Sequence, residues 1–230
     1  MRAIPGHVLT TRKSRSGFAA LALATVLASN ANTANAGNQV EEALSANVQA
    51  SLHRAVSDFP AAKLTFATAV EGDAWLKDMA QRLAPKMPDW PTRRDFLTTV
   101  QYEATRAGLD SQVVLGLIQH ESNFRKFAMS SADARGYMQV MPFWVKQIGN
   151  RDHNLFNLRT NLRYGCTILR HYLDIENGDY YRALGRYNGS LGRAEYPNAI
   201  LQDWKQNWSW NYPSAAGGVR AAQGSAPTVR

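Results

Sequence analysis

The sequence predicts an all-α fold on three observations. Apolar residues recur at helical spacing in several segments, and capping residues or prolines mark the ends of most of these segments. No stretch shows the sustained alternation of apolar and polar residues that a half-buried strand requires. We expect residues 92–212 to form the main domain and residues 37–91 an N-terminal helical segment, either an appendage or a part of the same domain.

The first expected helix has an apolar residue at every fourth position between residues 40 and 56. The second ends before Pro85, and Thr92 can cap a third that runs to Gly108, whose glycine suits a helix C-terminus. Asp110 can cap a fourth, and Gly- and Asn-containing turns separate the later ones. Apart from the first and the fourth, the expected helices cover residues 73–83, 92–108, 142–148, 161–175 and 179–186.

The C-terminal part of the chain is rich in tryptophan and then in small residues. Trp204, Trp208 and Trp210 are expected to pack a terminal helix onto the core, and stacking on sugar rings is the alternative. Ala, Gly and Ser dominate the last residues, so residues 213–230 are predicted to be a disordered tail.

Residues 1–36 have the features of a cleaved signal peptide. Basic residues precede an apolar run over residues 18–28, and Ala34-Asn35-Ala36 is a small-residue cleavage sequence. The run is shorter than the roughly 20 apolar residues that a membrane-spanning helix needs. We therefore expect cleavage after Ala36, secretion, and no membrane span in the mature chain.

The residue spacing excludes several classes of function, whereas the charge balance does not indicate one. Removing residues 1–36 takes away four of the 26 basic residues and no acidic residue, which lowers the formal charge from +8 to +4. This excess suits an acidic polymer and equally an ordinary solvated surface. No His or Cys cluster has metal-ligand spacing, and no nucleotide loop or nucleic-acid motif is present. We expect no cofactor, no metal and no nucleic-acid partner.

Glu121 continues the apolar face of the helix that Asp110 caps, because Val114, Leu117 and Ile118 lie at helical spacing before it. Burial at such a position disfavours the charged carboxylate and raises its pKa, which is typical of a general acid. A Glu at a frayed helix end can instead turn to solvent. Periodicity alone leaves both alternatives open.

Blocks of residues with a recognisable order lie between about residues 109 and 200. They are Glu121-Ser122-Asn123-Phe124, Ser130, Ala134-Arg135-Gly136-Tyr137-Met138-Gln139 with Met141-Pro142, Asn161-Leu162-Arg163-Tyr164-Gly165, and Ala183-Leu184 leading to Tyr187-Asn188. Their order and spacing resemble the soluble lytic transglycosylase family, whose fold is similar to goose-type lysozyme. The resemblance implies a lysozyme-like helical domain with a cleft that binds the glycan strands of peptidoglycan. The expected signal peptide gives the mature chain a periplasmic location.

The resemblance also implies a reaction. Glu121 would protonate the glycosidic oxygen between N-acetylmuramic acid and N-acetylglucosamine, and its carboxylate would then take the proton of the muramoyl C6 hydroxyl, which gives a 1,6-anhydro end. The substrate-binding positions that the family motif implies are Ser130, Gln139, Met141, Tyr187 and Asn188. Purely structural alternatives remain: helix capping for Ser130 and Asn188, backbone hydrogen bonding for Gln139, and core packing for Met141 and Tyr187.

Asp133 departs from the family pattern, because it replaces the usual Gly before Ala134. A hydrolytic muramidase needs a second carboxylate roughly 5 to 9 Å from the acid, and Asp133 is the candidate. We expect Asp133 to occupy a turn instead, since Asp tolerates unusual backbone angles. A third interpretation is a non-catalytic peptidoglycan-binding factor that assists an envelope-spanning secretion system.

Overall fold

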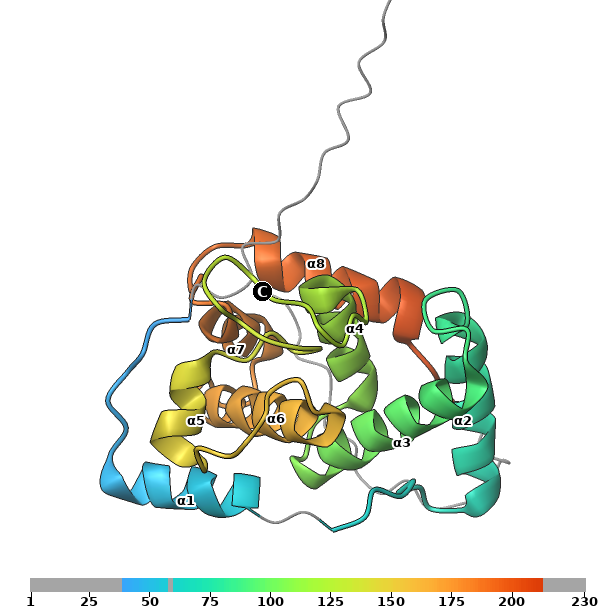
Figure 1. The fold of residues 1–230 in the computed structure, drawn as a ribbon. Coiled ribbons are helices and arrows are strands. Elements are labelled where there is room, and N and C mark those ends of the chain that lie inside the picture. The colour runs from blue at the N-terminus through green and yellow to red at the C-terminus, as the bar shows by residue number, and fades with distance from the viewer. Residues whose placement is uncertain (1–38, 58–59, 213–230) are drawn as a thin grey trace, which may run out of the picture. The chain divides into compact units, whose positions relative to one another are not determined.

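The computed structural model describes residues 39–57 and 60–212, and the all-α fold class is confirmed (Figure 1). The only β-structure in these residues is two isolated bridges, which join Arg135 to Met129 and to Val140. The helical elements are α1 (Ala46–Ser57), α2 (Ala69–Leu83), α3 (Trp90–Arg106), α4 (Ser111–Ser122), α5 (Pro142–Ile148), α6 (Leu158–Ile175), α7 (Tyr180–Tyr187), α8 (Glu195–Asp203) and the π-helical turn η1 (Trp204–Trp208).

The structure corrects several predicted helix boundaries. The first helix begins at Ala46 and not near Val40, which is 67% exposed, and Leu52 and Val56 are the buried residues of this helix. Asp89, not Thr92, caps α3: its carboxylate accepts a hydrogen bond from the Thr92 N–H at 2.9 Å. Helix α6 begins at Leu158, because Asn157 caps it. Helix α8, which ends at Asp203, was not delimited by the sequence pattern.

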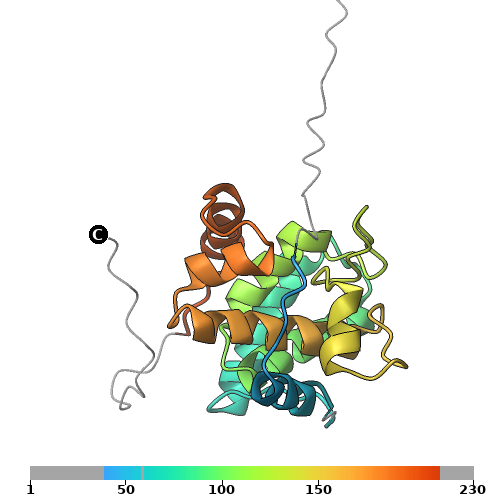
Figure 2. The ribbon, with the colours of Figure 1, turned by 90° about the vertical axis from the view of Figure 1, so that its left-hand side faces the viewer.

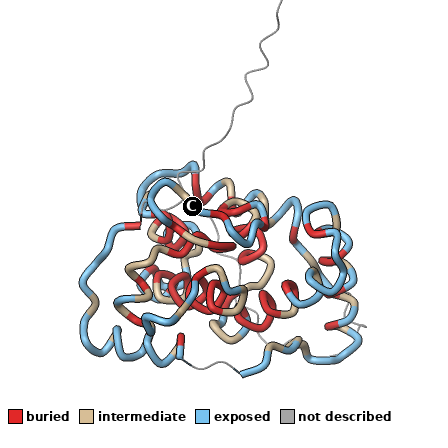
Figure 3. The backbone as a smooth tube through the Cα atoms, viewed as in Figure 1, coloured by how far each residue is buried: buried red, intermediate tan, exposed pale blue. Residues whose placement is uncertain are grey.

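Helix α6 lies at the centre of the described residues and packs against α1, α3 and α7 (Figures 1 and 2). Its burial is nearly continuous from Thr160 to Leu169, and Figure 3 shows the buried backbone concentrated there and along α3 and α4. The Arg163 guanidinium of α6 pairs with the Glu103 carboxylate of α3, and both side chains are fully buried. The pair satisfies both charges where water cannot reach them.

The first two helices contribute to the same hydrophobic core as the motif-bearing helices. That core takes residues from every helical element, for example Leu52, Trp75, Phe96, Leu117, Trp144, Leu169, Leu184, Ile200 and Trp208. The boundary at residue 91 remains a prediction. The predicted signal peptide and tail lie outside the described residues. None of the described helices is both long and apolar enough to cross a membrane.

Candidate active site

Glu121 lies one residue before the end of α4, on the face of the helix that packs into the core. Val114, Leu117 and Ile118 before it are fully buried, and Glu121 itself is only 7% exposed. Asn123 ends the helix in a left-handed conformation, with a φ of 48°. The structure therefore places the carboxyl on the buried side of the helix and not in solvent, which decides between the two alternatives that periodicity left open.

A tyrosine from a distant helix contacts this carboxyl. The Tyr196 hydroxyl of α8 donates a hydrogen bond to Oε1 of Glu121, whereas Oε2 is buried and has no hydrogen-bond partner among the described residues. Burial raises the pKa of Glu121 to about 8, and the bond from Tyr196 opposes that rise. At neutral pH the carboxyl therefore holds its proton, which is the state that a general acid requires.

Tyr196 was missed by the sequence analysis. It lies 75 positions after Glu121 and outside the motif blocks, so neither helical spacing nor the motif pattern pointed to it. Burial and the adjacent Glu121 carboxyl raise the pKa of Tyr196 well above its usual value, so the phenol stays protonated and can donate. His120 meets the Tyr196 ring edge to face at 5.1 Å, and burial lowers its pKa. Both groups are therefore uncharged at neutral pH.

The segment that follows α4 folds back on itself through buried side chains. Gln139 has a φ of 47°, and its amide donates to the carbonyls of Ala128 and Gly136 at 3.1 and 2.9 Å. The Asn161 amide of α6 accepts from the Met138 N–H at 2.8 Å and donates to the Arg135 carbonyl at 2.8 Å. These contacts fix the backbone between α4 and α5. Gln139 therefore makes the backbone hydrogen bonds that the sequence analysis gave as the structural alternative to a substrate contact.

Gly136 is required by this arrangement for two reasons. Its φ is +74°, in the left-handed region that disfavours a side chain. A Cβ there would lie 2.4 Å from the Asn161 amide nitrogen and 2.6 Å from the Leu155 carbonyl oxygen. Any larger residue would displace the Asn161 amide that holds the segment.

Tyr187 reaches the same segment from α7. Its hydroxyl is fully buried and donates to the Met138 carbonyl at 2.7 Å, not to Glu121. The neighbouring Glu121 carboxylate adds to burial in raising the pKa of Tyr187. The motif tyrosine therefore lies near the acid and orients the segment, while Tyr196 makes the direct bond.

Ser130 and Asp133 form a turn at the exposed end of the segment. The Ser130 hydroxyl accepts from the N–H groups of Ala132 and Ala134 at 3.2 and 3.1 Å. Asp133 has a φ of 68° and pairs with Arg135, with nitrogen to oxygen distances of 3.0 and 2.8 Å. The turn expected for Asp133 is present, and its carboxylate is held by a cation beside it.

The last two predicted positions lie at helix ends. Asn188 is the C-cap of α7, and its amide nitrogen donates to the Ser190 hydroxyl at 3.2 Å, while its buried Oδ1 has no partner among the described residues. Met141 is half-buried and precedes α5, with no side-chain capping bond. None of the five implied substrate-binding side chains hydrogen-bonds to Glu121 in the part of the chain that the structure describes. Their substrate contacts remain predictions.

Residues 98–207 match the family model of the Transglycosylase SLT domain. This range includes Glu121, Tyr196, the segment between α4 and α5, and all of α6 and α7. The chain carries an SLT-type transglycosylase domain. Among the described residues of this SLT domain and the helices before it, no group of three or more His, Cys, Asp or Glu side chains could hold a metal ion.

Relatives of the SLT domain are known in bacteria and in a bacteriophage. A protein of Haemophilus influenzae strain Rd, named membrane-bound lytic murein transglycosylase C, is 43% identical over 115 residues, which are 43% of this chain and 32% of that protein. A protein of Mannheimia succiniciproducens with the same name is 43% identical over 49 residues, which are 21% of this chain and 14% of that protein. The transglycosylase of Enterobacteria phage PRD1 is 30% identical over 112 residues, which are 46% of this chain and 41% of the phage protein. The chain thus spans less than half the length of these relatives.

Proposed function

We propose that the protein is a peptidoglycan lytic transglycosylase in which Glu121 is the single acid and base. The observation that carries the proposal is the buried Glu121 carboxyl of the SLT domain, whose pKa burial raises to about 8 and which Tyr196 holds by one oxygen. A carboxyl that is protonated at neutral pH can donate to a leaving oxygen. The names of the relatives, which include lytic murein transglycosylase, support the same substrate.

The proposed reaction proceeds without water. The Glu121 carboxyl gives its proton to the glycosidic oxygen as the bond from muramoyl C1 to that oxygen breaks, and N-acetylglucosamine leaves with a free 4-hydroxyl. The resulting carboxylate takes the proton of the muramoyl C6 hydroxyl as O6 bonds to C1. The product ends in 1,6-anhydro-N-acetylmuramic acid, and Glu121 regains its proton. In this scheme Tyr196 stabilises the carboxylate between the two proton transfers, because it donates to Oε1.

A hydrolytic muramidase is the alternative within the same substrate class, and it needs a second carboxylate across the scissile bond. Asp133, the candidate from the sequence, lies in an exposed turn and is paired with Arg135. That environment favours a structural role for Asp133. The geometry therefore favours the anhydro product.

The test compares wild type with Glu121→Gln on purified sacculi, with mass analysis of the released muropeptides. Glutamine keeps the shape and can still accept from Tyr196, but it cannot donate a proton to the leaving oxygen. We expect anhydro ends from wild type and a loss of cleavage of about 10⁴-fold in the variant, the upper end for general acid-base catalysis. Reducing muramic ends as the main product, or more than about a tenth of activity in a folded Glu121→Gln protein, would contradict the mechanism.

We also propose that the enzyme acts in the periplasm after cleavage at Ala36. The basic and apolar pattern of residues 1–36 supports export, and the names of the relatives place those proteins at a membrane and on murein. N-terminal sequencing of the protein from the periplasmic fraction should begin at Gly37. A form that begins at Met1 in the membrane fraction would overturn this location.

A further inference from the structure

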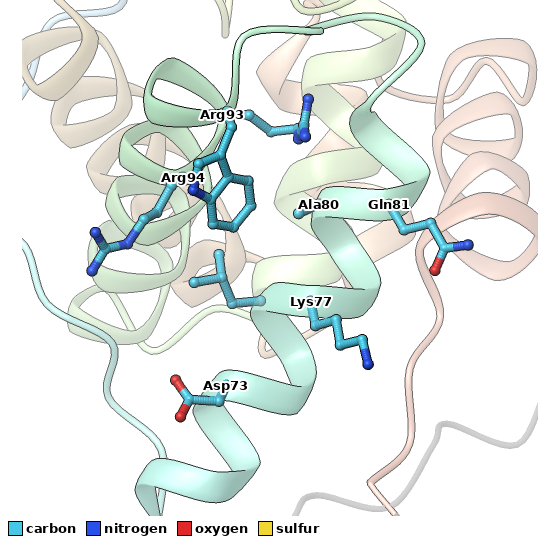
Figure 4. A pocket seen from close by; sticks show the side chains of 8 residues that line it. Asp73, Lys77, Ala80, Gln81, Arg93 and Arg94 are labelled. Atoms are coloured by element: carbon cyan, nitrogen blue, oxygen red, sulfur yellow. The ribbon is translucent and has the colours of Figure 1, made fainter.

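A pocket of about 480 Å³ lies between α2 and α3, and its lining residues are different from those around Glu121 (Figure 4). Leu76 and Ala80 of α2 form an apolar floor, because both are almost completely buried. Trp90, at the start of α3, is 48% exposed and offers its ring as a wall. A volume of this size is within the range that holds small ligands, which is about 300 to 1,000 Å³.

The rim of this pocket is predominantly positive. Lys77 of α2 and Arg93 and Arg94 of α3 line it, and Asp73 is the one acidic residue among the lining side chains (Figure 4). The rim therefore has three cations and one anion. A ligand that matches it has more carboxylates than ammonium groups, together with small apolar groups that can pack on Trp90 and the floor.

The cations differ in how they are held. Arg93 is fixed, because its guanidinium donates to the carbonyls of Met87 and Pro88 at 2.5 and 2.9 Å and lies 5.5 Å from the centre of the Trp90 ring. Lys77 and Arg94 are exposed, and neither side chain has an ion pair or hydrogen bond with a described residue. These two charges are available to a ligand.

We propose that this pocket binds the acidic peptide stem of peptidoglycan, an inference that rests on the proposed function. The carboxylates of the stem would pair with Lys77 and Arg94, an ammonium group of the stem would lie near Asp73, and its alanine methyl groups would pack on Trp90 and the floor. A neutral sugar would leave the three cations unused. Charge complementarity therefore favours the peptide over the glycan as the occupant.

The consequence for the enzyme is a second attachment to its polymeric substrate. A stem held between α2 and α3 keeps the connected glycan at a raised local concentration while α4 and α8 supply the chemistry. The pocket should therefore lower the KM for peptide-bearing strands and leave kcat unchanged. Strands without peptides should gain nothing from it.

The first experiment measures binding of a synthetic tetrapeptide stem by titration calorimetry. The test variant is Lys77→Glu/Arg94→Glu, and the control is Lys146→Glu/Arg151→Glu, which reverses one Lys and one Arg on and just after α5, well away from α2 and α3 in Figure 1. We expect binding to weaken about tenfold in the test variant and not in the control, because two exposed ion pairs are replaced by repulsions. Wild-type binding should also weaken with salt and with amidation of the peptide carboxylates.

The second experiment compares cleavage of peptide-bearing glycan strands with cleavage of strands stripped by an amidase. In the test variant, KM should rise about tenfold on peptide-bearing strands and stay at the wild-type value on stripped strands. If the charge reversal fails to fold by circular dichroism, Lys77→Gln/Arg94→Gln replaces it.

The outcomes separate the two proposals. Equal binding of the tetrapeptide by wild type, test variant and control, undiminished binding of the amidated peptide, or no binding to wild type would each overturn the pocket assignment. Absence of cleavage of both kinds of strand by wild type would overturn the proposed function, while the calorimetry would still decide the pocket.

Discussion

At the scale of single residues, the buried carboxyl of Glu121 makes stability depend on pH. Its pKa is about 8 in the folded chain and about 4.5 when exposed, so the folded state keeps a proton that the unfolded state releases. The free energy of unfolding therefore contains a contribution that is fully present below about pH 4.5 and is lost as the pH rises through about 8. Because glutamine does not titrate, Glu121→Gln should not lose unfolding free energy in this way as the pH rises.

We predict that Glu121→Gln is more stable than wild type at pH 8 by a few kcal/mol and that the difference shrinks toward pH 5, since a change of one in pKa corresponds to about 1.4 kcal/mol. Urea unfolding of both proteins at the two pH values measures this. A difference that stays constant with pH would show that Glu121 titrates normally.

The bond between Tyr196 and Glu121 predicts a shift of the alkaline limb of activity. The hydroxyl stabilises the charged carboxylate, so Tyr196→Phe should raise the pKa of Glu121 further and move the fall in kcat/KM to higher pH. The rate should also drop, because the carboxylate that acts as base loses its donor. Tyr180→Phe is the control, since that hydroxyl accepts from the Asp110 N–H at 3.1 Å and not from the site. If the fall in kcat/KM occurs at the same pH in Tyr196→Phe as in wild type, Tyr196 does not influence the pKa of Glu121.

At the scale of elements, α6 supports the site through a close approach to Met138. A Cβ on Gly165 would lie 2.3 Å from the Met138 sulfur and 2.8 Å from its Cβ. The Met138 carbonyl accepts from Tyr187, and its N–H donates to Asn161. Glycine in the middle of α6 therefore lets the helix lie directly against the segment that borders Glu121.

We predict that Gly165→Ala destabilises the protein by about 1 to 3 kcal/mol through overpacking and lowers cleavage at a temperature where it stays folded. Gly178→Ala is the matched control, because it is strained by a φ of +87° yet has no atom within 4 Å of the added Cβ. It should lose stability and keep activity. Equal activity loss in both variants would show that stability alone controls the rate.

At the scale of the whole molecule, α1 and α2 share the core of the helices that bear the motifs. Trp75, Met79 and Leu83 of α2 are fully buried. Residues 49 and 53 of α1 hydrogen-bond to the carbonyls of Gln147 and Ile148 at the end of α5. Without these two helices, apolar faces of α3, α5 and α6 would meet water.

We predict that the fragment of residues 92–212 does not fold to a stable domain, whereas residues 37–212 melt in one cooperative transition. Differential scanning calorimetry of both fragments tests this. An independently folded, active 92–212 fragment would show that the first two helices are an appendage.

Helical periodicity and turn preference depend on residues a few positions apart, so the sequence alone was enough to predict the all-α class, the apolar helix face that Glu121 continues and the turn at Asp133. The folded chain was needed to show that Tyr196 bonds to Glu121, that Tyr187 bonds to Met138, and that Lys77 and Arg94 line one pocket. These pairs lie on different helices, and their contacts depend on how the helices pack. Packing is set by the shapes of many side chains at once, which a spacing pattern does not contain.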